Sequence, residues 1–205
     1  MNILHIDRSP RQQSHSRQLS AAIVEKLLEV APGADIIRRD LGADPLPQTV
    51  ALYAAALASP ATLAAPPAGS LDLSEQLIRE VEAADAVVIG TPMHNLTIPS
   101  VLKAWIDQVL RVGRTMKSTP TGKVGMFRDR PVFIGVASGG FFTGERAKQP
   151  LAVAELDRPE DATILSAELC RHASGRTSQP FRPGGHIGVF KCVKQHYPFR
   201  RSATG

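Results

Sequence analysis

The sequence predicts one α/β domain in which parallel strands alternate with helices that cover both faces of the sheet. The chain has 205 residues, the length of one ordinary domain. Short apolar runs alternate with segments whose apolar residues recur at helical spacing. Two runs, AVVIGTP and PVFIGVAS, are continuous and lead into Gly or Pro, which is typical of strands buried on both faces.

The apolar runs give four strands, at residues 2–7, 35–41, 86–92 and 131–138. Helical spacing predicts helices at 17–30, 70–84 and 99–113, with a shorter helix near 50–58. The first helix ends at APG (31–33), because Pro cannot continue a helix and Gly accepts a left-handed cap. Residues 114–130 are expected to form an irregular excursion that contains Gly and Pro.

Composition bounds the class of protein. The start, MNILHIDRSP, has no basic region before its short apolar run, so we expect no secretory signal. The Ala-rich stretch at 51–67 is interrupted by Pro60 and is too broken to span a bilayer. Two cysteines, Cys170 and Cys192, make no disulfide framework. We therefore expect a cytoplasmic protein with no membrane partner.

The loop that follows the first strand, RSPRQQSHSR, has the composition of an anion site. It contains no carboxylate but three serines and three arginines: Ser9, Ser14, Ser16, Arg8, Arg11 and Arg17. Hydroxyls and backbone N–H groups at a helix start donate toward a phosphate, and the helix dipole adds positive potential. Arginines nearby would supplement that potential. The alternative is a solvated loop in which Ser14 or Ser16 caps the helix.

The usual nucleotide motifs are missing. No G-x-G-x-x-G occurs, and GGFFTG at 139–144 continues with Glu145-Arg146 instead of Lys-Ser/Thr, so ATP and GTP are disfavoured. A Ser-rich phosphate loop on a parallel α/β sheet leaves FMN, which binds flavodoxin-like sheets beyond the carboxyl ends of the strands.

Two further loops follow predicted strands and could bind the planar ring of FMN. TPMHNLTIPSVLKAW (91–105) places a rigid, proline-bounded loop after the third strand, with Pro92 and Pro99 fixing its shape. ASGGFFTGE (137–145) has glycines that allow the backbone to approach a ligand closely. All three loops are expected at one edge of the sheet, where they would form one site.

In this order, the three motifs resemble the FMN-dependent NADH:quinone oxidoreductase and azoreductase family over residues 1 to about 149. The matching phosphate-binding residues are Ser9, Ser14, His15 and Ser16. The flavin-ring loop, usually Met-Tyr-Asn-Phe or Met-His-Asn-Phe, matches Met93, His94, Asn95 and Leu96, preceded by Pro92. The Ser-x-Gly-Gly loop matches Ala137, Ser138, Gly139 and Gly140, with Ala in place of the first Ser.

The resemblance implies a flavodoxin-like, three-layer fold with strand order 2-1-3-4-5, bound FMN and a homodimer. It also implies ping-pong kinetics, in which NADH reduces FMN by hydride transfer and a quinone or aromatic azo compound takes two electrons. His94 is a candidate proton donor, although a loop histidine more often packs or faces solvent. Met93 is expected to be an apolar wall. No catalytic acid or base is required. A non-catalytic flavin electron carrier and an inactive truncated or frameshifted relative remain alternatives.

Residues 151–205 depart from the family, so we expect a flavodoxin-like FMN-binding domain at 1–150 and a divergent basic C-terminal segment, partly disordered, beyond it. Residues 169–205 carry seven Arg or Lys and no Asp or Glu, which leaves the rest of the chain at a formal charge of −2. Candidates for a late helix and a fifth strand lie at 161–171 and 186–193, and no closing helix follows. We hypothesise that the reading frame changes near Pro150.

Two other functions for this segment are disfavoured. Its possible zinc ligands lack paired C-x-x-C spacing, so we expect no metal site: Cys170, His172, His186, Cys192 and His196. Its basic and aromatic residues come without a nucleic-acid recognition motif, so we expect a solvated tail and no nucleic-acid partner.

Overall fold

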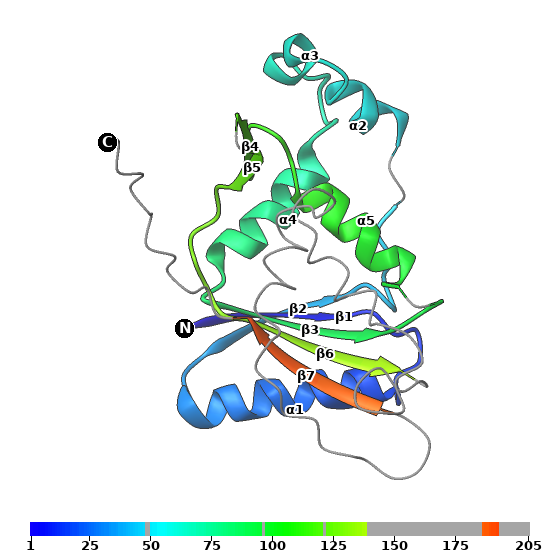
Figure 1. The fold of residues 1–205 in the computed structure, drawn as a ribbon, viewed down its shortest axis with the longest axis vertical. Coiled ribbons are helices and arrows are strands. Elements are labelled where there is room, and N and C mark those ends of the chain that lie inside the picture. Colours follow the sequence, from blue (N-terminus) through cyan, green and yellow to red (C-terminus); the bar gives the residue numbers. More distant parts are fainter. Residues whose placement is uncertain (48–49, 96, 121, 139–185, 193–205) are drawn as a thin grey trace, which may run out of the picture.

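The computed structural model describes residues 1–47, 50–95, 97–120 and 122–138, and the backbone of 186–192. One sheet, in the order β2-β1-β3-β6-β7, crosses the described part of the molecule (Figure 1). Its strands are β1 (Asn2–Asp7), β2 (Asp35–Asp40), β3 (Ala86–Pro92), β6 (Val132–Ser138) and β7 (His186–Cys192). The first four strands pair in parallel, which confirms the flavodoxin-like class and its 2-1-3-4 order.

Helices cover both faces of this sheet. Figure 1 shows α1 (His15–Val30) on one side, and α4 (Asp72–Ala83) and α5 (Ser100–Val109) on the other. Ile3, Val24 and Val88 form a small core under α1. A larger core lies under α4 and α5, where Trp105 is 1% exposed. The sheet is therefore buried on both faces, as the continuous apolar strands predict.

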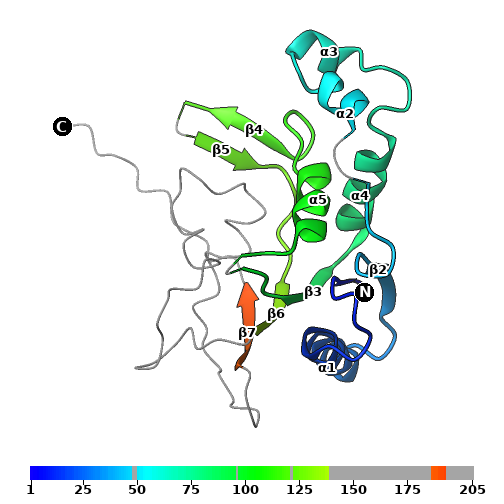
Figure 2. The ribbon, with the colours of Figure 1, turned by 90° about the vertical axis from the view of Figure 1, so that its right-hand side faces the viewer.

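Four small elements lie in two segments; the sequence predicts a single short helix in the first segment and irregular structure in the second. The expected helix near 50–58 is α2 (Ala51–Ala56), and a second short helix follows, α3 (Pro60–Ala64). Ser59 and Thr62 form a capping box at the start of α3, and Pro60 occupies its first turn. Within 114–130, β4 (Met116–Thr119) and β5 (Gly122–Gly125) pair as an antiparallel hairpin. Figure 2 shows α4 and α5 between the sheet and these outer elements.

The fifth strand lies where the sequence places it but runs in the other direction. β7 pairs antiparallel to β6, with Ile134 opposite Phe190, so the sheet is parallel in its first four strands only. A crossover helix before β7 would deliver a parallel strand. The expected helix at 161–171 lies outside the described residues. None of the described helices is both long enough and apolar enough to cross a membrane.

Candidate functional site

The carboxyl ends of β1, β3 and β6 bring the described parts of the three loops together. Asp7, the last residue of β1, lies opposite Gly90 of β3. Pro92, the last residue of β3, lies opposite Ala137 of β6. Beyond the ladder, the N–H of Met93 donates to the carbonyl of Ala137 at 2.9 Å. The three motifs therefore share one edge of the sheet.

The serines of the first loop are buried at this edge. Ser9, Ser14 and Ser16 are 2%, 4% and 0% exposed. Ser14 caps α1, because its Oγ accepts from the N–H of Arg17 at 3.4 Å, and its hydroxyl shares a 3.2 Å hydrogen bond with that of Ser16. Ser9 Oγ accepts from the N–H of Arg11 at 3.3 Å. The helix-capping interpretation of Ser14 is thus confirmed, and each hydroxyl still has bonding capacity for a ligand.

Arg8 is the unusual group of the site. Its side chain is 1% exposed, and its Nε donates to the carbonyl of Gly90 at 3.4 Å. Both terminal nitrogens, Nη1 and Nη2, find no hydrogen-bond partner among the described residues. Burial lowers the pKa of the Arg8 guanidinium to about 9, although the Asp7 carboxylate acts in the opposite direction. At neutral pH the site therefore holds a buried cation with unsatisfied donors.

The other two arginines of the loop have different surroundings. Arg11 is exposed and, with Gln12, Gln13, Ser14 and His15, lines an open depression of about 490 Å³. Arg17 turns back to the protein and bonds the Ser9 carbonyl and the Asp40 carboxylate. The sequence suggested that all three arginines serve the anion, whereas the donors of Arg17 are engaged within the fold.

The second loop is a tight turn. His94 and Thr97 exchange two backbone hydrogen bonds, of 3.0 and 2.9 Å, and Asn95 between them has φ +48°. Asn tolerates this left-handed conformation better than most residues. His94 and Asn95 are exposed, and Met93 is partly buried against the larger core. Its expected role as an apolar wall stays a prediction. Leu96 lies outside the described residues.

The third loop is described only at its start. Ala137 and Ser138 are half-buried at the end of β6. Gly139 and Gly140 lie outside the described residues. Of the thirteen residues assigned to the cofactor from the sequence, ten fall in the described segments. All ten lie at this edge, in the loops, at the ends of β3 and β6 or in the first turn of α1.

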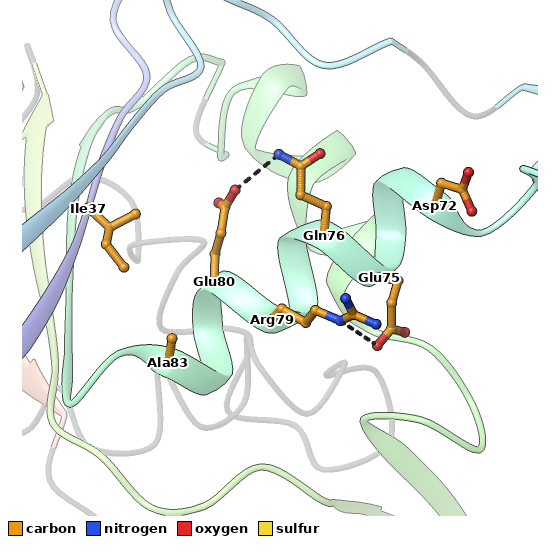
Figure 3. A pocket seen from close by; sticks show the side chains of 7 residues that line it. All are labelled: Ile37, Asp72, Glu75, Gln76, Arg79, Glu80 and Ala83. Atoms are coloured by element: carbon orange, nitrogen blue, oxygen red, sulfur yellow. Dashed lines mark hydrogen bonds and ion pairs between the residues drawn. The ribbon is translucent and has the colours of Figure 1, made fainter.

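A second depression, of about 560 Å³, lies away from this edge between β2 and α4 (Figure 3). Its polar lining is engaged in contacts within the protein: Gln76 donates to Glu80 at 3.4 Å, and Arg79 lies 3.4 Å from Glu75. Such satisfied charges suit a solvated surface. The described residues contain no cluster of three or more metal-ligating side chains. The sulfur and imidazole candidates of the C-terminal segment have no described side chains.

The sequence did not predict the residues at the end of β2 that support the first loop. Asp40, the last residue of β2, bonds Arg17, and Gly42, in the turn that follows, lies against Ser9. The signal was available in the letters DLG at 40–42, since Asp followed two residues later by Gly is typical of a tight turn at a strand end.

Comparison with known proteins agrees with this geometry. Residues 1–166 match the family described as having a flavodoxin-like fold. An FMN-dependent NADH:quinone oxidoreductase of Pseudomonas fluorescens is 51% identical over 150 residues, 73% of this chain and 71% of that protein. An enzyme of the same description from Burkholderia lata is 46% identical over 153 residues, 73% of this chain and 72% of that one.

Solved structures with the same fold include two proteins of Bacillus anthracis. An azoreductase has a TM-score of 0.64 at 28% identity, covering 80% of this chain and 83% of its own. An FMN-dependent NADH-azoreductase in complex with FMN has a TM-score of 0.61 at 25% identity, covering 70% and 72%. On its fold, its three motifs and these matches, the chain belongs to the family of FMN-dependent NADH:quinone oxidoreductases.

Proposed function

We propose that this protein is an FMN-dependent NADH:quinone oxidoreductase that also cleaves aromatic azo compounds, with FMN at the shared carboxyl edge of β1, β3 and β6. The observation that carries the proposal is the buried Arg8 guanidinium, whose two terminal nitrogens lack partners among the described residues, next to three buried serines. A phosphate dianion would satisfy those donors and offset the buried charge. The names of the relatives supply the reaction.

The residues of this edge fit the parts of FMN. Arg8, Ser9, Ser14 and Ser16 would hold the phosphate, together with the N-terminus of α1. The exposed turn at His94 and Asn95 would bind the ring, since its backbone is fixed by the bonds between His94 and Thr97. When bound, FMN supplies the two-electron chemistry between NADH and the acceptor. No described carboxylate or histidine is required as an acid or base, and we assign His94 to binding.

The first experiment measures FMN binding and turnover with the full chain. FMN fluorescence is expected to be quenched on titration with protein, and FMN-loaded protein should oxidise NADH with a benzoquinone or an aromatic azo dye. FMN binding without NADH oxidation would favour an electron carrier. No quenching at saturating protein would refute the proposal.

Two serine-to-alanine variants, one at the site and one as a control, make this test more specific. Ser9→Ala should weaken FMN binding about tenfold or more, because a hydrogen bond to a charged group contributes about 1.5–3 kcal/mol. Ser118→Ala, on β4 and away from the edge, is the control and should bind as the wild type does. Equal affinity in both variants would remove Ser9 from the phosphate site.

We also propose a homodimer. Exposed apolar side chains occur on the outer elements, at Val50, Leu52, Leu57, Val112, Val124 and Met126. These side chains form one group around α2 and another around the hairpin of β4 and β5. Helix α3 lies between the two groups, because a Cβ at Gly113 would lie 3.7 Å from Leu63. Sedimentation of the wild type is expected to give a dimer, and Val124→Asp with Met126→Asp should give a monomer. A monomeric wild type would refute this point.

A further proposal concerns the boundary between the flavodoxin-like domain and the C-terminal segment. It is based on the composition of that segment and on the direction of β7. We propose a flavodoxin-like domain at 1–150 and a divergent segment at 151–205 that arises from a change of frame near Pro150. The antiparallel direction of β7 and the absence of acidic residues after Glu168 support divergence beyond residue 166, where the family match ends. The coding DNA decides: the idea fails if no single-base insertion or deletion restores a family-like C-terminus. The proposal places the enzyme in the cytoplasm, where the NADH it consumes is found.

A further inference from the structure

The side chain of Arg17 reaches from the first turn of α1 back to the start of the phosphate loop. Its Nε and Nη2 both donate to the carbonyl oxygen of Ser9, at 3.0 and 2.7 Å. The side chain is 11% exposed. A guanidinium that places two donors on one carbonyl fixes both the position and the direction of that peptide. The backbone on which Ser9 sits is therefore held by a side chain eight residues later.

Arg17 is itself held by carboxylates at the ends of two strands. Its Nη2 donates to Asp40 Oδ1 at 2.5 Å, and its Nη1 lies 3.7 Å from Asp7 Oδ2. Asp40 Oδ1 also accepts from the N–H groups of Gly42 and Ala43, at 3.1 and 3.0 Å. The hydrogen bond from Arg17 lowers the pKa of the Asp40 carboxyl below its ordinary value. One carboxylate thus joins the turn after β2 to α1.

The turn after β2 also contacts the phosphate loop directly. A Cβ placed on Gly42 would lie 2.3 Å from the Ser9 carbonyl oxygen and 3.0 Å from the carbonyl carbon of Arg8. Only a residue without a side chain fits there. The Ser9 peptide is therefore enclosed by Gly42 on one side and bonded by Arg17.

We propose that Arg17 and Asp40 form a positioning pair that shapes the loop at Ser9–Ser14 for a phosphate, and that Arg17 is not itself a phosphate ligand. The inference rests on the proposed function, since the phosphate belongs to FMN. A loop held in its binding shape before the ligand arrives loses less conformational freedom on binding. The pair therefore sets the preference for FMN over riboflavin, which lacks the phosphate.

The decisive variant is Asp40→Asn. Asn keeps an oxygen for the amides of the turn but removes the charge that holds Arg17. If Arg17 positions the loop, FMN binding should weaken about tenfold, with riboflavin binding changed less than twofold. If Arg17 instead binds the phosphate, removing a nearby negative charge should leave FMN affinity unchanged or raise it, and that result would overturn the inference.

Arg17→Lys provides an independent variant. Lys keeps the charge but cannot place two donors on the Ser9 carbonyl, so a positioning role predicts the same selective loss of FMN affinity. Wild-type FMN affinity in this variant would overturn the inference. The matched controls are Glu80→Gln and Arg39→Lys. This ion pair joins β2 to α4 away from the loop and is also largely buried, with 19% of the Arg39 side chain and 17% of the Glu80 side chain exposed. Both controls should bind FMN as the wild type does.

Hydrogen–deuterium exchange of the ligand-free protein separates this inference from the proposed function. The amides of residues 11–16 should exchange faster in Asp40→Asn and Arg17→Lys than in the wild type or the controls. Failure of the wild type to bind FMN would refute the proposed function alone, and the pair would then be judged on exchange. Unchanged exchange in both variants would overturn the inference, whatever the outcome of FMN binding.

Discussion

Replacing Arg8 with methionine should stabilise the ligand-free protein and weaken its affinity for FMN. Methionine fills a similar volume without a charge, so the buried cation is removed with little loss of packing. The pKa of Arg8 falls to about 9 in the fold. That fall from the ordinary value of an arginine corresponds to about 5 kcal/mol against the charged form, an upper bound. The variant also loses the hydrogen bond to Gly90, so we expect a net gain of about 1–4 kcal/mol.

The sign of the pH dependence provides a second check. A base whose pKa is lowered by folding destabilises the protein fully below the folded value, and the penalty decreases as the pH rises through it. The stability difference between Arg8→Met and the wild type should therefore be constant up to about pH 8 and decrease above pH 9. Urea denaturation at several pH values measures this difference directly.

FMN should narrow the difference in stability between the variant and the wild type. A phosphate that pairs with Arg8 stabilises the wild type more than the variant, and loss of a charged hydrogen-bonded pair should weaken binding about 10- to 100-fold. Arg11→Met, at an exposed position in the same loop, is the control. A variant that is less stable than the wild type without FMN, or that binds FMN equally well, would refute the assignment of Arg8.

Three further predictions concern stability. Glu75, whose pKa is lowered to about 2 chiefly by hydrogen bonding from Arg114, should contribute about 2 kcal/mol at neutral pH. The difference between Glu75→Gln and the wild type should therefore persist above pH 5 and disappear as the pH falls through 2 in acid denaturation. Asn95→Val should destabilise by about 1–2 kcal/mol because φ is +48°, whereas Asn95→Gly should be tolerated; equal urea midpoints would contradict the strain argument. Gly90→Ala should cost about 1–3 kcal/mol, because its Cβ would lie 2.6 Å from Ser20 Oγ, while Gly33→Ala has open space and should cost less than 1 kcal/mol.

Sequence patterns predicted the inner strands of the sheet well because these strands are buried on both faces. The runs ending at Pro92 and Ser138 are almost entirely apolar, so their type and order follow from composition and alternation with helices. The hairpin of β4 and β5 was missed because its two strands are four residues each and largely exposed, which leaves no apolar alternation to detect.

The sequence predicted which residues form the candidate site, but it did not predict that the three arginines of the site have different roles. Sequence distance places Arg8, Arg11 and Arg17 equally near the serines. Their roles depend on contacts with Gly90 and Asp40, which come from β3 and β2 and are far away in the chain. No local pattern encodes such contacts, so tertiary packing alone separates the buried cation from the one that braces the loop.

The position of β2 at the rim of the sheet has a consequence for handling the protein in solution. An uncovered strand offers unpaired backbone groups on which a second chain can add, a route to aggregation. Four of the six residues of β2 are charged, Asp35, Arg38, Arg39 and Asp40. Juxtaposing another strand there would desolvate these charges, so this rim should resist edge-to-edge association even at high concentration.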